Sequence, residues 1–243
     1  VTHLHGDHCI GILGLLQTMN LQNRTESVEI FGPDGIDEFI AANIKILNFG
    51  LSFPVFISKI NEGMIVDEKD YSVSASDAKH GIPAFSFRFD EKDRPGQFFP
   101  EKAQALKIPE GKLWHELQTG NSIEMDGKEI VPSQVTGDKR PGRRIGISGD
   151  TRPTEKLVEF FKNCDYVSFD STFADELKEK AIEANHSTAK EAAELAEKAN
   201  ISTLILTHFS ARYNDESVLL EEAKKIHDNT ITAKDLLEVN ILK

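Results

Sequence analysis

Three histidines and one aspartate lie within six residues near the start of this chain, in the pattern His-x-His-x-Asp-His. Side chains two apart on extended backbone point to the same side, so His3 and His5 can converge on one cation. Gly6 allows a tight turn, after which Asp7 and His8 can face a second cation. Imidazole and carboxylate ligands suit zinc, with iron or manganese as alternatives. A polar loop that is merely rich in histidine is the other explanation, but three of the eight histidines fall here.

Four further candidate ligands follow segments with the pattern of a strand: His80, Asp150, Asp170 and His208. Taken alone, His80 would be assigned as a surface histidine, but the cluster at residues 3–8 favours a ligand. Asp150 is placed to join the histidines, because a carboxylate can bridge two divalent cations and hold them about 3.5–4 Å apart. The sequence therefore predicts a metal site built from strand ends.

His186 lies just before a predicted helix. Ser187 or Thr188 can cap the N-terminus of that helix, and Glu191 occupies the capping-box position if Thr188 is the cap. A polar residue that simply precedes a cap is the alternative for His186. Its place near the predicted ligands makes it a candidate for the site.

The loop after His208 supplies Ser210, Arg212 and Tyr213, which we expect to line the same cleft. Arginine offers a fork of donors that suits a phosphate group. The alternative is that Arg212 satisfies nearby carbonyl groups.

The elements that position these residues alternate between helices and strands. Apolar spacing predicts helices from Ile10, from Asp34 and after Thr188. Strand patterns cover residues 29–31, 53–60, 71–75, 85–89, 144–148, 166–170 and 203–207. This alternation predicts a layered α/β domain with a large sheet.

Residues 91–144 interrupt that alternation and are rich in glycine, proline and charge, which indicates an insertion. They hold ten basic and nine acidic side chains, a net of +1, so the total of −12 leaves −13 on the rest. Four basic residues within 139–144 can pair with phosphate oxygens. Ordinary solvated surface is the alternative.

The composition excludes several classes. Hydrophobic residues make up 39% of the chain, enough for a core, and no apolar run approaches the ~20 residues of a membrane helix. The net charge argues against a general nucleic-acid surface. Cys9 and Cys164 form no disulfide framework, which fits a reducing cytoplasm. Val1-Thr2-His3 has the pattern of the last step of a strand, so we expect an N-terminal segment with at least one more strand to precede it.

The order of these motifs resembles the metallo-β-lactamase superfamily, and within it the ribonuclease Z family. The segments that carry the resemblance are THLHGDH, HGIPAFSFRF, DRPG, SGDT, NHST and THFSARY, which run from Thr2 to Tyr213. The His-x-His-x-Asp-His pattern alone is common to the superfamily. Its combination with His186-Ser187-Thr188 and with His208-x-Ser210-x-Arg212-Tyr213 is much more specific. Asp170 stands where that family more often has glutamate.

The resemblance implies an αββα sandwich in which residues 1–243 form the catalytic domain, with its first strands missing, and residues 91–144 an inserted arm that grips tRNA. It implies a homodimeric, cytoplasmic endonuclease that cleaves the 3′ trailer from precursor tRNA by metal-hydroxide attack on a phosphodiester. It also implies two zinc ions per chain. The first is held by His3, His5 and His80, the second by Asp7, His8 and His208, and Asp150 bridges them.

In that family the carboxylate at Asp7 also accepts a proton, and the histidine at His186 aids protonation of the leaving group. Asp170 could orient His186, as carboxylates orient catalytic imidazoles. Two other functions stay open. One is a different hydrolase of the same fold, acting on a small phosphodiester, ester or thioester. The other is a non-catalytic RNA-binding protein with a relic site.

Overall fold

The computed structural model describes residues 1–241, which divide into two compact units. The first comprises Val1–Asp90 and Arg144–Val239. The second comprises Glu91–Arg143 together with residues 240–241 at the end of the described chain. Each unit has its own buried apolar cluster, so each is described by itself.

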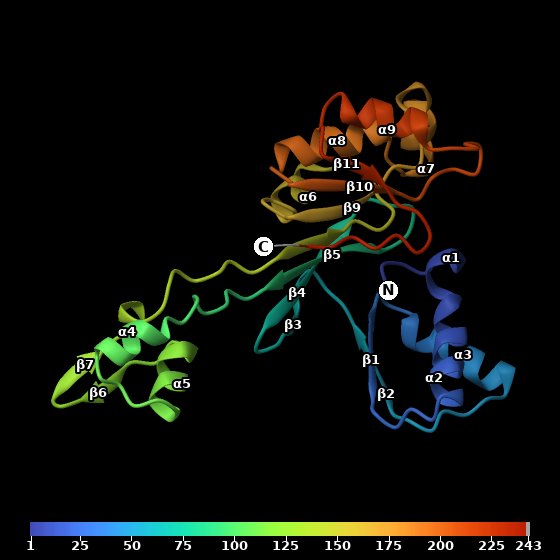
Figure 1. Ribbon diagram of the computed structural model, residues 1–243. Helices are drawn as coiled ribbons and strands as arrows, with labels where there is room; N and C mark the ends of the chain where they lie inside the picture. The colour runs from blue at the N-terminus through green and yellow to red at the C-terminus, as the bar shows by residue number, and fades with distance from the viewer. Residues whose placement is uncertain (242–243) are drawn as a thin grey trace. The chain divides into compact units, whose positions relative to one another are not determined.

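A seven-stranded mixed sheet forms the centre of the first unit, in the order β11-β10-β9-β8-β5-β4-β3 (Figure 1). Its strands are β3 (Gly63–Asp67), β4 (Tyr71–Ala78), β5 (Ala84–Glu91), β8 (Arg144–Ile147), β9 (Tyr166–Asp170), β10 (Thr203–Thr207) and β11 (Thr230–Thr232). Strands β8 to β11 are parallel, and β5 is antiparallel to β8. The connection from β4 to β5 is too short for a parallel crossover, so β4 runs in the direction of β8. The C-terminal ends of β4, β8, β9 and β10 therefore lie along the same side of the sheet, which is the sheet edge referred to below.

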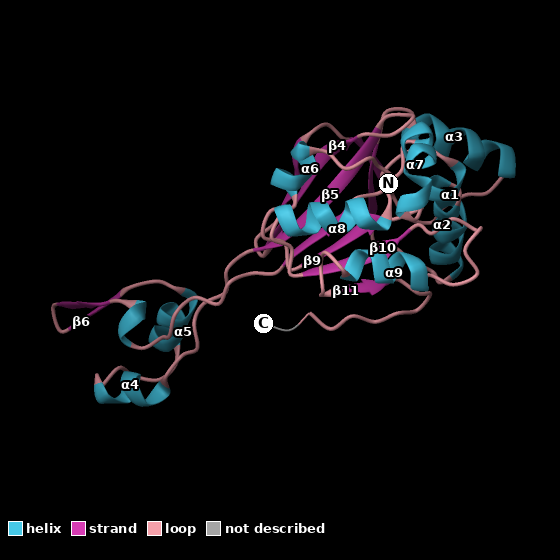
Figure 2. Cartoon of the chain, turned by 90° about the horizontal axis from the view of Figure 1, so that it is seen from above, coloured by secondary structure: helices cyan, strands magenta, loops and turns pink. Residues whose placement is uncertain are grey.

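Three helices cover one face of this sheet, as Figures 1 and 2 show: α6 (Glu155–Phe160), α8 (Ala189–Lys198) and α9 (Ser217–Lys224). A short helix, α7 (Lys178–Ala184), and a 3-10 turn, η2 (Asp175–Leu177), precede α8. Helix α8 is alanine-rich, so its backbone lies close against β9 and β10. The cluster beneath it includes Phe161, Phe169 and Leu204, all fully buried. Thr188 and Glu191 form the predicted capping box at its start.

A smaller layer of the first unit contains a two-stranded parallel sheet, β1 (Val28–Gly32) and β2 (Val55–Lys59), beside α2 (Gly11–Leu21) and α3 (Ile36–Leu47). A single-turn helix, α1 (Gly6–Cys9), leads into α2. Leu16, Ile36 and Ile40 form the centre of the apolar cluster that joins these elements. The segment that carries the histidine cluster is thus anchored on both sides of its turn.

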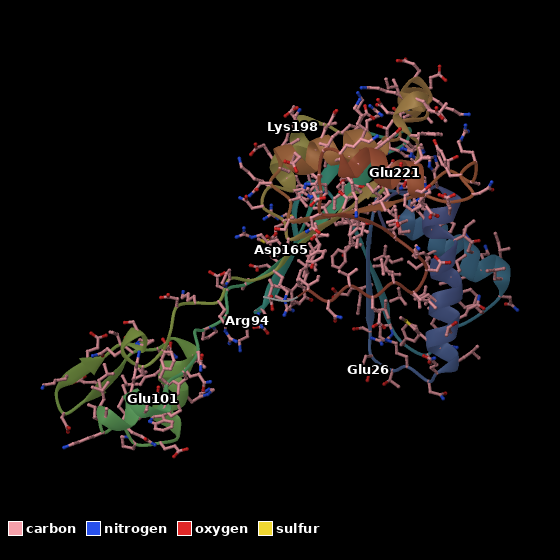
Figure 3. The ribbon with its side chains drawn as sticks, turned by 45° about the horizontal axis from the view of Figure 1, so that its top comes forward. Glu26, Arg94, Glu101, Asp165, Lys198 and Glu221 are labelled. Carbon is pink, nitrogen blue, oxygen red and sulfur yellow. The ribbon has the colours of Figure 1, made fainter. Side chains whose placement is uncertain are left out.

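The second unit consists of a stalk of two antiparallel segments and a small head. The head contains α4 (Pro100–Ala105), α5 (Lys112–Thr119), β6 (Ile123–Met125), β7 (Lys128–Ile130) and η1 (Pro132–Gln134) around Leu117 and Val135. In the stalk Arg94 and Arg140 exchange backbone hydrogen bonds of 2.9 Å. A Cβ at Gly96 would lie 2.0 Å from the carbonyl oxygen of Gly137, so only glycine fits there. Figure 3 labels Arg94 in the stalk and Glu101 in the head.

The predicted strands 166–170 and 203–207 have the bounds observed, because buried apolar runs end at polar residues in both. Strand β3 was not predicted, since its exposed Met64 sits where a buried residue is expected in a strand pattern. The helices of the second unit were missed as well, because their apolar residues are few and separated by charge. No helix among residues 1–241 is long and apolar enough to span a membrane.

Candidate metal centre and active site

The predicted ligands come together at the sheet edge where β4, β8, β9 and β10 end. His80 follows β4, Asp150 follows β8, Asp170 ends β9 and His208 follows β10. The histidine cluster reaches the same edge because its backbone is tied to β5: the amide of Phe85 donates to the carbonyl of Thr2 at 3.0 Å. Four segments far apart in sequence thus meet the first eight residues.

Three imidazoles form a nearly equilateral group. The ring centroids of His3, His5 and His80 are each 4.9 Å from the other two. One ring nitrogen from each lies within 4.8 Å of the others, a spacing at which they can share one cation. These are the three residues predicted as one ligand set.

A second group consists of Asp7, His8 and His208, whose ligand atoms also lie within 4.8 Å of one another. Asp150 lies between the two groups. Its Oδ2 is 3.3 Å from Nε2 of both His8 and His208 and 3.7 Å from Nε2 of His3. A carboxylate at that place can contribute to both groups at once.

Two backbone positions of unusual geometry set these side chains. His208 has a φ of 64°, in the left-handed region, which is uncommon for residues other than glycine although histidine is enriched there. Gly149, next to Asp150, has a φ of 60°, and a Cβ there would lie 3.0 Å from the side chain of Thr2. Glycine adopts such a φ without strain, whereas at His208 the conformation has a cost, which is typical of functional sites where surrounding contacts hold it in place.

Hydrogen bonds to the other ring nitrogens fix the tautomers of two of the histidines, His80 and His208. Nδ1 of His80 is 3.1 Å from the carbonyl oxygen of Asn185, which can only accept, so Nδ1 is the protonated nitrogen. Nδ1 of His208 is 2.8 Å from the hydroxyl of Thr172, whose proton goes to Asp170 at 2.7 Å. Nδ1 of His3 contacts the hydroxyl of Thr2 at 3.0 Å, a group that can donate or accept. In His80 and His208, Nε2 is therefore the unprotonated nitrogen, as in histidines that bind a metal through Nε2.

The burial, hydrogen bonding and protonation of His3 indicate whether these residues suit a metal ion. Its side chain is fully buried and its Nε2 has no hydrogen-bond partner, which is costly for a polar atom unless a cation takes the lone pair. Burial, together with the neighbouring imidazoles His8, His80 and His5, lowers the pKa of His3 to about 3. The ring is therefore neutral at physiological pH, which is the form that binds metal. With borderline nitrogen and hard oxygen donors, the set fits zinc.

His186 and Asp170 form a hydrogen-bonded pair beside these groups. Nδ1 of His186 is 2.8 Å from Oδ2 of Asp170, and the ring stacks on His208 at a centroid distance of 5.0 Å. Burial lowers the pKa of His186, but the hydrogen bond and the charge of Asp170 raise it more, so the net pKa is raised. Asp170 is itself fully buried and accepts from the backbone amides of Thr151 and Thr172. The pair thus has a protonatable imidazole with a fixed orientation.

Sequence analysis missed the side chains that hold this pair. Arg152 donates to the carbonyl of His186 and to both carboxylate oxygens of Glu191. Thr172 links Asp170 to His208 as described above. The spacing of Thr172 two residues after Asp170 is a local signal for such a contact. Arg152 and Glu191 are 39 residues apart, and no local pattern connects them.

The loop after His208 is held close to the same edge. The amide of Ser210 donates to the carbonyl of Thr172 at 3.1 Å, and the Tyr213 hydroxyl accepts from the amide of Ala174 at 2.8 Å. Arg212 donates to the Ser210 hydroxyl at 3.0 Å, and its guanidinium carbon lies 5.3 Å from the centre of the Phe173 ring. Its contacts are a hydroxyl and a ring face, so the alternative of local carbonyl partners finds no support in them.

The basic residues within 139–144 have local partners. Arg140 donates to the carbonyl of Pro95 at 3.1 Å, and Arg143 lies 3.9 Å from Glu91. Arg144 lies 3.7 Å from Asp90. Because these three side chains already have local partners, the contacts favour the alternative of an ordinary protein surface over a phosphate-binding patch.

Comparison with known proteins gives the family. A family model described as a beta-lactamase superfamily domain matches residues 97–209. The chain is 61% identical over 241 residues to the ribonuclease Z of Nitrosopumilus maritimus (strain SCM1), covering 99% of this chain and 81% of that protein. It is 41% identical over 242 residues to the ribonuclease Z of Methanosarcina acetivorans, covering 99% and 79%.

Solved structures agree on the fold. The crystal structure of human tRNase Z, short form, has a TM-score of 0.68 and 24% sequence identity, covering all of this chain and 78% of that one. This likeness concerns the arrangement of the elements, whereas the sequence relatives carry the family assignment. The chain therefore belongs to the ribonuclease Z family and has the fold of the metallo-β-lactamase superfamily.

Proposed function

We propose that this chain is a zinc-dependent endoribonuclease that removes the 3′ trailer from precursor tRNA. The observation that carries the proposal is that a member of the ribonuclease Z family keeps all seven predicted ligand side chains gathered at one sheet edge. Loss of even one ligand would have favoured a relic site. The non-catalytic alternative has no such support.

Two zinc ions per chain are proposed, with Asp150 contributing to both. The first ligand set is His3, His5 and His80, and the second is Asp7, His8 and His208. Zinc bound there supplies Lewis-acid neutralisation of charge on the phosphate and activates the attacking water. The short contacts among nitrogen and carboxylate atoms support this assignment, because cations would offset the repulsion between their lone pairs.

We assign His186 as the group that protonates the leaving oxygen. Asp170 accepts the hydrogen bond from Nδ1, so the other ring nitrogen is the one available to donate a proton to substrate. The raised pKa increases the protonated fraction at neutral pH. Asp170 thus acts as the carboxylate partner that keeps the imidazole oriented and charged.

Asp7 is proposed as the proton acceptor, in addition to its place in the second ligand set. Its side chain is 67% exposed, so solvent and substrate can reach it. Burial is the largest single influence on its pKa and raises it, but a backbone hydrogen bond and the nearby His8 and His208 together lower it more, so the carboxylate is ionised. Ser210, Arg212 and Tyr213 are proposed as substrate contacts, with Arg212 directed at a phosphate.

The second unit is proposed as an arm that binds the body of tRNA. Its separate apolar cluster supports this role, because a small head can be presented on a stalk without any contribution to the catalytic fold. In the described head, Lys102, Lys107, Lys112 and Lys128 are exposed cations available to phosphates. The stalk arginines are a weaker choice because they have local partners.

A homodimer is proposed as the assembly. Several large apolar side chains are half or more exposed on the adjacent helices α2 and α3: Leu15, Leu21, Ile46 and Leu47. A second copy would remove that surface from water. We propose the cytoplasm as the compartment, because Cys9 and Cys164 are both free thiols.

The test replaces residues 97–135 by a short Gly/Ser linker and compares two substrates. We expect cleavage of a precursor tRNA transcript to collapse through lost binding, because positioning contributes much of catalysis on a large substrate. Hydrolysis of bis(p-nitrophenyl) phosphate should stay within about tenfold, or ~1.4 kcal/mol. If the intact protein hydrolyses the small diester and leaves precursor tRNA uncut, the small-substrate hydrolase is correct instead.

A further inference from the structure

Arg152 makes an unusual set of contacts for a residue that lies two positions after a predicted metal ligand. Its guanidinium donates to both carboxylate oxygens of Glu191 and, through Nη1, to the backbone carbonyl of His186. The side chains of Arg152 and Glu191 are only 11% and 8% exposed. A buried bidentate pair of this kind has a defined geometry, because the planar fork matches the carboxylate.

The same segment also holds the residue before His80. The backbone amide of Arg152 donates to the carbonyl of Lys79 at 2.9 Å, and the amide of Lys79 donates to the hydroxyl of Thr151 at 3.0 Å. The Ser187 hydroxyl donates to the carbonyl of Thr151. Residues 151–152 therefore connect the loop of a predicted zinc ligand to the loop of His186.

Glu191 completes the connection from the other side. It accepts from the backbone amide of Thr188 at 3.1 Å, and its own amide donates to the Thr188 hydroxyl at 3.1 Å. This capping box fixes the start of α8, and His186 lies two residues before the cap. Arg152 therefore holds the His186 backbone both directly and through the helix cap.

Three hydrogen bonds act on His186. Asp170 orients the ring through Nδ1, the backbone amide donates to the carbonyl of Ala181 at 2.8 Å, and the backbone carbonyl accepts from Arg152. Without the bond from Arg152 the peptide after His186 could rotate, and the ring could keep its bond to Asp170 and still shift its second nitrogen away from the leaving oxygen. The hydrogen bond between the ring and Asp170 therefore does not by itself determine where the proton is delivered.

We propose that Arg152, with Glu191, is a positioning residue that places His186 for protonation of the leaving group, without itself touching substrate. This rests on the proposed function, in which His186 is the proton donor. Lysine cannot substitute, since one ammonium group cannot serve both carboxylate oxygens and the carbonyl in the same plane. Charge alone is therefore insufficient at this position.

The test compares Arg152→Lys with the parent on two substrates in single-turnover assays. A precursor tRNA transcript has a poor leaving group, whereas the nitrophenolate of bis(p-nitrophenyl) phosphate needs no proton. We expect Arg152→Lys to slow the first substrate about 10- to 100-fold, the usual range for losing an orienting partner. The second should change by less than about twofold, with metal content unchanged. Equal slowing of both substrates would overturn the proposal.

A double-mutant comparison adds a second criterion. In a His186→Ala background, Arg152→Lys should cause no further slowing on precursor tRNA, because the group it positions is gone. Additive slowing would assign Arg152 a separate, purely structural role. If Arg152→Lys folds poorly, Arg152→Met combined with Glu191→Gln removes the pair without leaving a buried charge unpaired and keeps a residue able to form the capping box.

Arg88 provides the matched control. It makes the same kinds of contact, donating to both carboxylate oxygens of Asp90 and to the carbonyl of Phe160 at 2.7 Å, but none of these partners belongs to the site. Arg88→Lys should lower the thermal midpoint without changing the ratio of rates on the two substrates. A change in that ratio for Arg88→Lys would refute the assignment to Arg152.

A readout in the metal-free protein separates this proposal from the proposed function. The Nδ1 proton of His186, bonded to Asp170, should give a downfield resonance in histidine-labelled protein. We expect Arg152→Lys to shift or broaden it, whereas Arg88→Lys should leave it in place. If the parent does not cleave precursor tRNA, the proposed function fails, and this resonance still decides whether Arg152 positions His186. An unmoved resonance would overturn the positioning role.

Discussion

Replacement of Asp170 by asparagine tests the proton-donor assignment most directly. Oδ2 of Asp170 accepts from the Thr151 amide at 2.9 Å and from Nδ1 of His186 at 2.8 Å. Oδ1 accepts from the amide and hydroxyl of Thr172, at 3.1 and 2.7 Å. Asparagine is nearly the same shape but has only one oxygen. One of the two sites must therefore become a donor.

Either orientation of the new amide leaves one backbone N–H without its acceptor. With NH₂ at the Oδ2 place, Thr151 loses its partner, and His186 must accept at Nδ1 rather than donate. With NH₂ at the Oδ1 place, the Thr172 amide loses its partner. A buried donor without an acceptor costs about 1–3 kcal/mol. For a domain of this size that is about 2–12 °C in thermal midpoint, since each kcal/mol corresponds to about 2–4 °C.

The effect on cleavage should be much larger than the effect on folding. Loss of the carboxylate charge removes the largest of the causes that raise the pKa of His186, ahead of Asp150 and Asp7, so less imidazolium is present at neutral pH. We expect single-turnover cleavage of precursor tRNA to fall about 10²- to 10⁴-fold, the scale of a general acid. A typical stability of about 5–15 kcal/mol keeps the variant folded, so unfolding cannot account for that loss.

Three measurements check this prediction: the cleavage rate, the zinc content and the thermal midpoint. The control is Glu197→Gln, because Glu197 also pairs with a histidine, at 2.6 Å from Nδ1 of His227, and neither belongs to the site. The control should change stability only. Parental cleavage by Asp170→Asn would refute the orientation argument. Loss of zinc along with cleavage would instead assign Asp170 to the metal centre, through Thr172 and His208.

Three further predictions concern the metals, the substrate and stability. Asp150→Ala should abolish cleavage and reduce bound zinc from two per chain, and metal analysis of the parent finding fewer than one would contradict the two-metal proposal. Arg212→Ala should weaken cleavage of precursor tRNA without metal loss, with Arg212→Lys restoring only part, and unchanged kinetics in both would return Arg212 to a structural role. Burial raises the pKa of Glu191, but Arg152 and the Thr188 amide lower it more, so the pKa in the folded protein lies below the ordinary value of 4.5. The ionised carboxylate therefore stabilises the fold above pH 4.5, and this stabilisation is lost as the pH falls through the pKa of the folded protein. Glu191→Gln should therefore unfold more easily than the parent at neutral pH, and denaturant titrations should show the difference shrinking below about pH 4.5; a constant difference would contradict the ion-pair explanation.

Much of the site was predictable from the sequence because His80, Asp150 and His208 follow strands, Asp170 ends one, and His186 precedes a helix cap. Parallel strands deliver their C-terminal ends to one edge, so strand patterns before Asp150, Asp170 and His208 were enough to bring these residues together. The capping box at Thr188 and Glu191 was visible for the same reason, since its residues are three apart. Local periodicity and strand direction carry this information.

The supporting contacts could not be predicted in that way. Arg152 and Glu191 meet only after α8 has packed on the sheet, and the pairing of the Asn185 carbonyl with His80 depends on a left-handed residue at the end of α7. The left-handed backbone at His208 could not be predicted either, because most histidines adopt other conformations even though histidine is enriched in this region. These features arise from tertiary packing, which a single sequence pattern does not encode.

Asp170 has both a position that was predictable from the sequence and contacts that were not. Its position at the end of β9 was predicted, but its four hydrogen bonds join the proposed proton donor to the predicted zinc ligand His208 through Thr172. One buried carboxylate therefore orients two imidazoles that stack on each other. A glutamate at this position would carry its carboxylate one methylene further from β9. The same bonds would then require the Thr151 and His186 loops to lie correspondingly further out, so the shorter side chain and the loops that surround it here are best understood as one matched set.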